Sequence, residues 1–187
     1  MVVSFGSVLV GQCSTWDSRL VCYCLDNSKI CNETMDGMDS WLVWSFSELM
    51  MGRWFEYGPN SQHLPCRQGK HGQDIAEGWS GIVVFHRGDE KYHQKAYHMN
   101  PGATSEQICW HCRASRVRDS PNLYTFFGPN APYRETALTL EAFICETTRP
   151  NPWVRLPGFH PEVLIYDWLH CFDLGLLSDA AASVTWP

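Results

Sequence analysis

The sequence predicts an α/β fold, and two observations lead to this prediction. A short β-branched run, Gly81–Phe85, ends at a sharp turn carrying an acid, Arg87-Gly88-Asp89, and a polar, helix-capable stretch follows from Glu90 to Met99. This order is typical of a buried strand that leads through a tight turn into a helix. A further helix is indicated around Leu140–Glu146, so strands and helices share the chain.

Breakers divide the rest of the chain into further elements. We expect a strand at Leu20–Leu25 and a loop over residues 58–77, which hold several glycines and prolines. The aromatic stretch Trp41–Phe55 has apolar residues at helical spacings but also Val and Trp, so its type stays open. Near the end, Pro161 suits a first helical position, and the very apolar run after it predicts a buried helix interrupted at Gly175.

Length and charge exclude several classes of protein. The 187 residues suit one domain with an ordinary core, and a charged share of 18% argues against disorder. Fourteen Lys and Arg against twenty Asp and Glu give a net charge of −6. This excludes a small, strongly basic nucleic-acid binder but not local basic patches. No stretch approaches the ~20 apolar residues of a membrane span, so we expect no membrane partner.

Nine cysteines, an odd number, favour a reducing compartment over a disulfide scaffold. The only C-x-x-C pair sits among histidines, which favours an intracellular protein with a metal site. A secreted, disulfide-bonded protein remains the alternative because four cysteines cluster near the start. These are Cys13, Cys22, Cys24 and Cys31.

Cys109 and Cys112 are candidate zinc ligands, since two thiolates this close on a turn can bind one ion at about 2.3 Å each. A structural site needs four ligands. The best donors for the other half are Asp167 and His170, whose spacing of three residues places them on one helix face. The spare candidates are Cys171 and His160. Two buried thiols with a satisfied core histidine are the structural alternative, and a redox C-x-x-C fits the local context less well.

Asp89 is a candidate ligand for a divalent metal, because it directly follows the predicted strand and would be held by rigid backbone at the sheet end. A turn-capping aspartate is the commoner explanation of a single such residue. Asp36 and Asp39 lie upstream and could supply a partner. Two carboxylates from different strands can hold Mg²⁺ for phosphoryl-transfer chemistry.

Two groups of basic side chains complete the candidates. Three arginines follow the C-x-x-C directly and could contact phosphates, or belong to a solvated loop; they are Arg113, Arg116 and Arg118. Three histidines lie in or just before the predicted helix, and we interpret them as ordinary surface residues. They are His86, His93 and His98.

Taken in order, these motifs form a recognisable set. Gly88-Asp89 is followed, after about twenty residues, by Cys109-x-x-Cys112 and then Arg113-Ala114-Ser115. Leu156-Pro157-Gly158-Phe159 then leads into Asp167-Trp168-Leu169-His170 and Leu174-Gly175. The set resembles the core of CACTA-type DNA transposases, and even more the transposase-like open reading frames of dinoflagellate algae. The resemblance covers about residues 78–177.

The resemblance implies a DDE transposase with an RNase H-like fold, a mixed sheet flanked by helices. In that family three acids bind two divalent metals, Mg²⁺ or Mn²⁺, which activate the attacking oxygen and stabilise the leaving one. Residues 1–100 would then be a partial RNase H-like core, and residues 101–187 a zinc-stabilised helical insertion containing Cys and His. Asp89 matches the second family acid, and Asp36 is our choice for the first, with Asp39 in reserve. The insertion motifs match Cys109, Cys112, Asp167 and His170.

The chain departs from the family pattern near its end. The third acid, a Glu on a later helix, should lie well past the Asp167–His170 segment, but the sequence stops at Pro187. Leu169 also replaces the usual Met. We therefore expect a fragment, a truncated copy or a degraded relic that is inactive as the isolated chain. Because the net charge is negative we expect weak DNA affinity, and we expect a nuclear location. The alternative function is a non-enzymatic, zinc-stabilised binding module of unknown partner.

Overall fold

The computed structural model describes residues 2–6, 19–24, 26, 28, 31–102, 104–126 and 128–167. Two compact units divide the chain, Met1–Met35 and Asp36–Pro187, where length alone suggested one domain. The described part contains both helices and strands, so the predicted α/β class holds at this level. None of its helices is both long and apolar enough to cross a bilayer.

The first unit contains an antiparallel strand pair. Strand β1 (Val2–Gly6) pairs with β2 (Arg19–Cys24), and an irregularity between Val3 and Ser4 shifts the register. The predicted strand at Leu20–Leu25 is confirmed as far as Cys24, and Leu25 lies outside the described residues.

Helix α2 (Asn32–Met51) resolves the ambiguous aromatic stretch. Gly52 directly follows the last residue of α2, and its positive φ of 66° lets the amide of Arg53 donate back to the Glu48 carbonyl oxygen at 3.3 Å. The buried face of α2 includes Asp39 and Glu48 beside Val43. Acids on a buried face blur the hydrophobic periodicity, which explains why the sequence pattern was mixed.

The loop after α2 is confirmed as a loop and contains one 3-10 turn, η2 (Pro65–Arg67). It folds back on the end of α2: the Arg67 guanidinium lies 3.7 Å from the Trp54 ring centre and 3.3 Å from the Glu48 carboxylate. The backbone amide of Phe55 also donates to Glu48, at 2.7 Å. A buried carboxylate with these donors fixes the loop to the helix.

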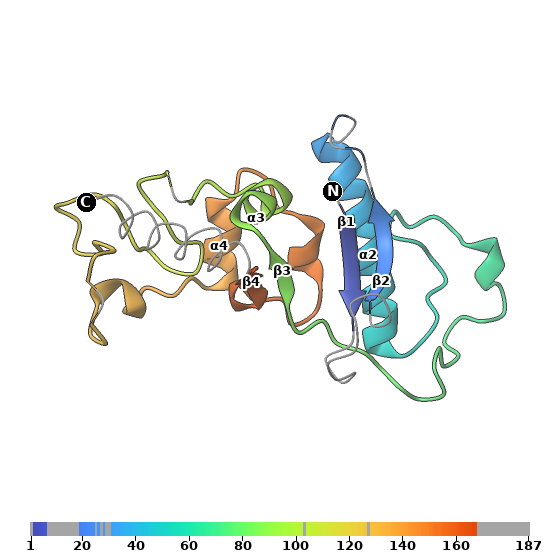
Figure 1. Ribbon diagram of the computed structural model, residues 1–187. Helices are drawn as coiled ribbons and strands as arrows, with labels where there is room; N and C mark the ends of the chain where they lie inside the picture. Colours follow the sequence, from blue (N-terminus) through green and yellow to red (C-terminus); the bar gives the residue numbers. More distant parts are fainter. Residues whose placement is uncertain are drawn as a thin grey trace. The chain divides into compact units, whose positions relative to one another are not determined.

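The centre of the second unit is a strand–helix–strand arrangement (Figure 1). Strand β3 (His86–Gly88) leads into α3 (Glu90–Tyr97) and pairs in parallel with β4 (Leu164–Tyr166). His98 caps the end of α3 and adopts a left-handed conformation with φ of 52°. The predicted helix is therefore confirmed up to Tyr97.

The predicted buried strand at Gly81–Phe85 is wrong. These residues have no regular structure, and Ile82 and Phe85 are exposed. The strand begins only at His86 because β4, its partner, is three residues long and follows directly on a 3-10 turn, η5 (Pro161–Val163). The predicted helix after His160 is wrong up to Asp167, because these residues form the turn η5 and the strand β4, which pairs with β3. Residues 168–187 lie outside the described part.

The remaining helix, α4 (Leu140–Glu146), forms where it was predicted, and the Thr139 side chain caps it. The other short elements are the 3-10 turns η3 (Pro132–Glu135) and η4 (Pro152–Arg155). An aromatic core joins these segments: the ring of the fully buried Tyr97 stacks on Phe159 at 5.9 Å and meets Phe143 edge-on at 6.3 Å.

Candidate metal and nucleic-acid sites

An aspartate directly follows each of the strands β3 and β4. Asp89 follows β3 and Asp167 follows β4, and the register that pairs Gly88 with Tyr166 places the backbones of these two acids next to each other. The backbone amide of Asp167 donates to the Gly88 carbonyl oxygen at 2.9 Å and so extends the ladder to the acids. Neighbouring strands lie about 4.8 Å apart, so the two acids start from adjacent backbone positions. The sequence assigned Asp167 to zinc and did not anticipate this neighbour.

Asp89 also caps α3. Its Oδ1 atom accepts a hydrogen bond from the backbone amide of Tyr92 at 2.5 Å, which satisfies one of the unpaired donors of the first helical turn. The capping role considered from the sequence is therefore confirmed. It fixes the carboxylate at the edge of the sheet.

Asp36 has its partners at the other end of α3. Its carboxylate lies 2.6 Å from Arg149 and 3.2 Å from the Nε2 atom of His98. His98 ends α3 and Asp89 begins it, so about 13 Å of helix separates their backbones. The structure thus places the predicted first acid in an ion-pair cluster away from the two strand-end acids.

Asp39, the reserve acid, is 1% exposed and belongs to a buried polar network. It accepts a hydrogen bond from the Nδ2 atom of Asn151 at 3.1 Å, and the same nitrogen lies 2.5 Å from the Ala96 carbonyl oxygen. The Oδ1 atom of Asn151 accepts from the Trp153 amide at 2.8 Å. This network joins α2 to the last turn of α3, and its geometry indicates a structural role.

The C-x-x-C turn packs directly against β4. Trp110 is buried and stacks on Tyr166 with ring centres 4.5 Å apart, and the Nε2 atom of His111 donates to the Leu164 carbonyl oxygen at 3.0 Å. Cys109 accepts from the His111 amide at 3.3 Å. Burial raises the pKa of the Cys112 thiol to about 11, so without a metal it is protonated at neutral pH.

The predicted zinc ligands fall only partly within the described residues. The described part of the chain contains no group of three or more His, Cys, Asp or Glu placed to hold a metal. Cys109 and Cys112 share one turn, whereas His170 and Cys171 lie outside the described residues. The cysteines with described side chains are free thiols: Cys31, Cys66, Cys109, Cys112 and Cys145.

A cavity of about 310 Å³ opens beside the C-x-x-C turn. Cys112, His111 and the spare ligand His160 line it, and His160 lies 3.8 Å from the Glu162 carboxylate. The Cys112 thiol therefore shares this cavity with two imidazoles, although these three side chains are not arranged as a metal site.

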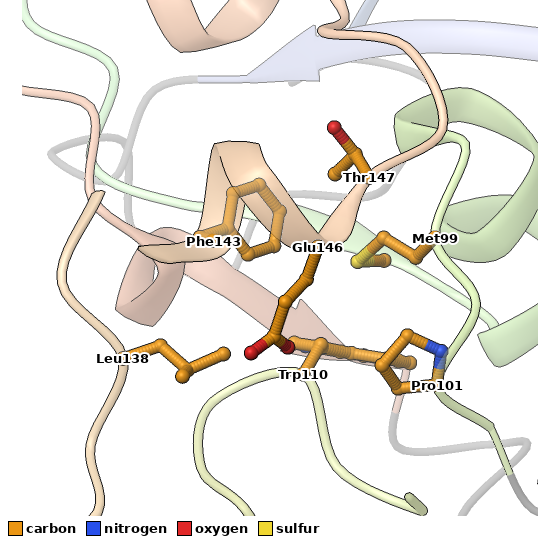
Figure 2. A pocket seen from close by; sticks show the side chains of 7 residues that line it. All are labelled: Met99, Pro101, Trp110, Leu138, Phe143, Glu146 and Thr147. Carbon is orange, nitrogen blue, oxygen red and sulfur yellow. The ribbon is translucent and has the colours of Figure 1, made fainter. Parts of the chain in front are cut away.

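A second hollow lies between the C-x-x-C turn and α4 (Figure 2). Figure 2 shows the Glu146 carboxylate directed into a mostly apolar surround that includes Trp110, Leu138 and Phe143. The hollow has no room for a water molecule, so it is a packing gap and not a ligand site.

The three candidate phosphate-binding arginines differ in their surroundings. Arg113 pairs with Glu146 at 2.8 Å, and Glu146 also accepts from Gln107 at 3.0 Å. Arg116 and Arg118 are exposed and have no ion-pair partner among the described residues. Only these two are therefore available to an anionic ligand.

The interpretation of the three histidines as surface residues is wrong. The His93 side chain is fully buried and its Nε2 atom donates to the Ile165 carbonyl oxygen at 3.0 Å. His98 is 7% exposed. His86 binds the hydroxyl groups of Tyr97 and Tyr92, and burial lowers its pKa to about 3, with His93 adding a smaller effect. Tyr92 and Tyr97 directly precede His93 and His98 in the sequence, and these aromatic neighbours were the available signal that the histidines are buried.

Comparison of the chain with protein-family models, curated proteins and solved structures found no match.

Proposed function

We propose that this chain is a transposase-derived DNA-processing domain in which Asp89 and Asp167 hold a divalent cation, Mg²⁺ or Mn²⁺. One observation carries the proposal: two adjacent parallel strands each run directly into an aspartate. Carboxylate oxygens are the protein ligands that Mg²⁺ prefers, and a cation held at a sheet edge is accessible to a phosphate. The resemblance of the ordered sequence motifs is the basis for proposing the transposase family and an RNase H-like fold. A nuclear location is part of the same proposal.

Asp167 replaces Asp36 as the partner of Asp89 in this proposal. A single cation between two carboxylates can bind a phosphate oxygen and neutralise its charge. Cleavage by the two-metal route needs enough carboxylate to hold two ions about 4 Å apart. Because the described residues bring only two acids together here, we expect the isolated chain to bind the cation without cutting DNA.

Titration with Mn²⁺, followed by the loss of the free-ion EPR signal, tests the proposal. The wild type should bind about one Mn²⁺ per chain, and Asp89→Asn/Asp167→Asn should bind at least about tenfold more weakly. Asparagine also caps helices well, so the variant keeps the start of α3. Asp119→Asn, at an exposed site elsewhere, is the control for loss of charge. Equal Mn²⁺ binding by the double variant and the wild type would refute the proposal.

A second candidate function is a zinc-stabilised binding module, favoured by the two thiols on a turn whose Trp110 and His111 contact β4. Cys109 and Cys112 would hold the ion with His170, and Asp167 or Cys171 would complete the set. The two candidates differ at Asp167. If it binds Mn²⁺ beside Asp89, Asp167→Asn should retain zinc; if it is a zinc ligand, the same variant should lose zinc, as measured by mass spectrometry of protein purified without chelator.

A further inference from the structure

Residues 115–126 form a loop that exposes both cations and aromatic rings. Arg116 and Arg118 lie on the surface without an ion-pair partner among the described residues. Tyr124 and Phe126, from the same loop, are 37% and 51% exposed. Exposed rings and guanidinium groups on one loop offer two kinds of contact to a ligand, stacking on the rings and attraction to the charges.

Hydrogen bonds hold this loop in a defined shape. The amide of Tyr124 donates to the Ser115 carbonyl oxygen at 2.9 Å, which brings the end with the rings back beside the end with the arginines. Between them, a turn is closed by the Ser120 amide donating to the Val117 carbonyl oxygen at 3.0 Å. The loop is therefore pre-organised, and binding a ligand would cost little conformational entropy in the loop.

The loop is also attached at both ends to its surroundings. The Arg116 amide donates to the Glu106 carbonyl oxygen at 2.8 Å, and the Tyr133 hydroxyl donates to the Phe126 carbonyl oxygen at 2.8 Å. The backbone positions that carry the cations and the rings are consequently held relative to one another.

The charge of the loop is opposite to that of the protein. Residues 115–126 contain two arginines and Asp119, a net charge of +1, whereas the whole chain carries −6. An anionic partner would be repelled by the net charge of the chain as a whole and attracted by the net charge of this loop. Arg113 is not counted among the phosphate-binding residues, because the Glu146 carboxylate pairs with it and neutralises its charge.

We propose that this loop binds single-stranded DNA, with phosphates on Arg116 and Arg118 and bases stacked on Tyr124 and Phe126. Base stacking on aromatic rings requires unpaired bases, which a duplex does not offer. The choice of DNA as the partner rests on the proposed function, since strand processing produces single-stranded ends. The loop extends that function by supplying a place for the strand outside the cation site.

Fluorescence anisotropy with a labelled 12-nucleotide oligothymidine, in EDTA and across 50–200 mM NaCl, tests the loop without any cation. The wild type should bind the single strand more tightly than a 12-base-pair duplex. Arg116→Gln/Arg118→Gln should weaken binding and reduce the slope of log affinity against log salt by about 1.4, since each contacted phosphate contributes about 0.7. Tyr124→Ala/Phe126→Ala should weaken binding about fivefold or more while the slope stays unchanged.

Matched controls are Arg155→Gln, an exposed arginine on η4, and Trp79→Ala, a ring that is 78% exposed. Both should bind like the wild type. Binding that prefers the duplex, or that neither loop variant changes, would overturn the proposal. Asp89→Asn/Asp167→Asn should bind the oligonucleotide normally in EDTA. If the wild type binds the oligonucleotide but no Mn²⁺, the proposed function fails and the loop proposal stands. If the wild type binds Mn²⁺ but the oligonucleotide does not bind at the loop, the loop proposal fails and the cation site stands.

Discussion

Lowering the pH from 7.5 to 5.0 should destabilise the fold through His86. The ring is held between two hydroxyl groups, with Nε2 2.9 Å from the Tyr92 oxygen and Nδ1 bonded to that of Tyr97. Trp153 covers it with a ring-centre distance of 4.8 Å. In this surround burial lowers the pKa of His86 to about 3, so the native state holds the imidazole neutral.

The size of the effect follows from proton linkage. In the unfolded chain a histidine has a pKa near 6.5, so the unfolded state binds the proton first as the pH falls. A lowered native pKa therefore contributes stability that is complete above pH 6.5 and is lost between there and about pH 3. At pH 5.0, about 1.5 units below the pKa of the unfolded chain, the histidine is protonated in the unfolded state and still neutral in the native state. This difference lowers the free energy of unfolding by about 2 kcal/mol. His93 and His111, whose pKa values burial also lowers, add to the loss in the same direction.

Urea unfolding followed by tryptophan fluorescence at the two pH values measures this loss. His86→Gln keeps a polar group for the two tyrosines but cannot titrate, so its free energy of unfolding should change with pH by about 2 kcal/mol less than that of the wild type. His71→Gln, at an exposed position, should behave like the wild type. A pH dependence in His86→Gln as steep as in the wild type would refute the placement of His86 in a dry aromatic surround.

Three further predictions concern the metal sites and the buried network. Zinc should copurify at near one ion per chain and be lost in Cys109→Ser/Cys112→Ser, as counted by mass spectrometry; undiminished zinc would exclude the thiol pair as ligands. Asn151→Ala should lower the urea midpoint by the equivalent of about 2–4 kcal/mol, because it removes three buried hydrogen bonds, one of them to a carboxylate. The exposed Asn130→Ala should change stability by less than about 0.5 kcal/mol, and equal effects would contradict the network. Incubation with supercoiled plasmid and Mg²⁺ or Mn²⁺ should give no nicked product; nicking that Asp89→Ala abolishes would show that a further acid completes the site.

Local signals in the sequence predicted local structure. The turn at Asp89 and the polar stretch after it gave the start of α3, because an acid at an N-cap satisfies helix donors within three residues of itself. Helix α4 follows the same logic with Thr139 as its cap. The C-x-x-C turn and the exposed arginines near it were also visible as patterns of neighbours.

Pairing between distant segments was not visible. The run Gly81–Phe85 has better strand composition than His86–Gly88, yet only the latter pairs with Leu164–Tyr166. A short apolar run such as Leu164–Tyr166 forms a strand or a helix according to whether a partner strand is present, and that partner lies far away in the sequence. The same non-local pairing decides that Asp167, and not Asp36, lies next to Asp89.

Burial of polar residues was the other missing information. Asp39, Glu48 and His93 lie in the interior because each has a partner from another segment, and hydrophobicity scales place such residues at the surface. The RNase H-like fold and the zinc-binding insertion stay predictions that rest on the ordered motifs.

A crystal soaked in Mn²⁺ tests the central claim most directly, because the anomalous signal of manganese locates the ion. The account predicts a peak at the carboxyl ends of β3 and β4, within about 2.5 Å of a carboxylate oxygen from both Asp89 and Asp167. A well-ordered crystal with no manganese there, or with the ion bound to Asp36 instead, would contradict it.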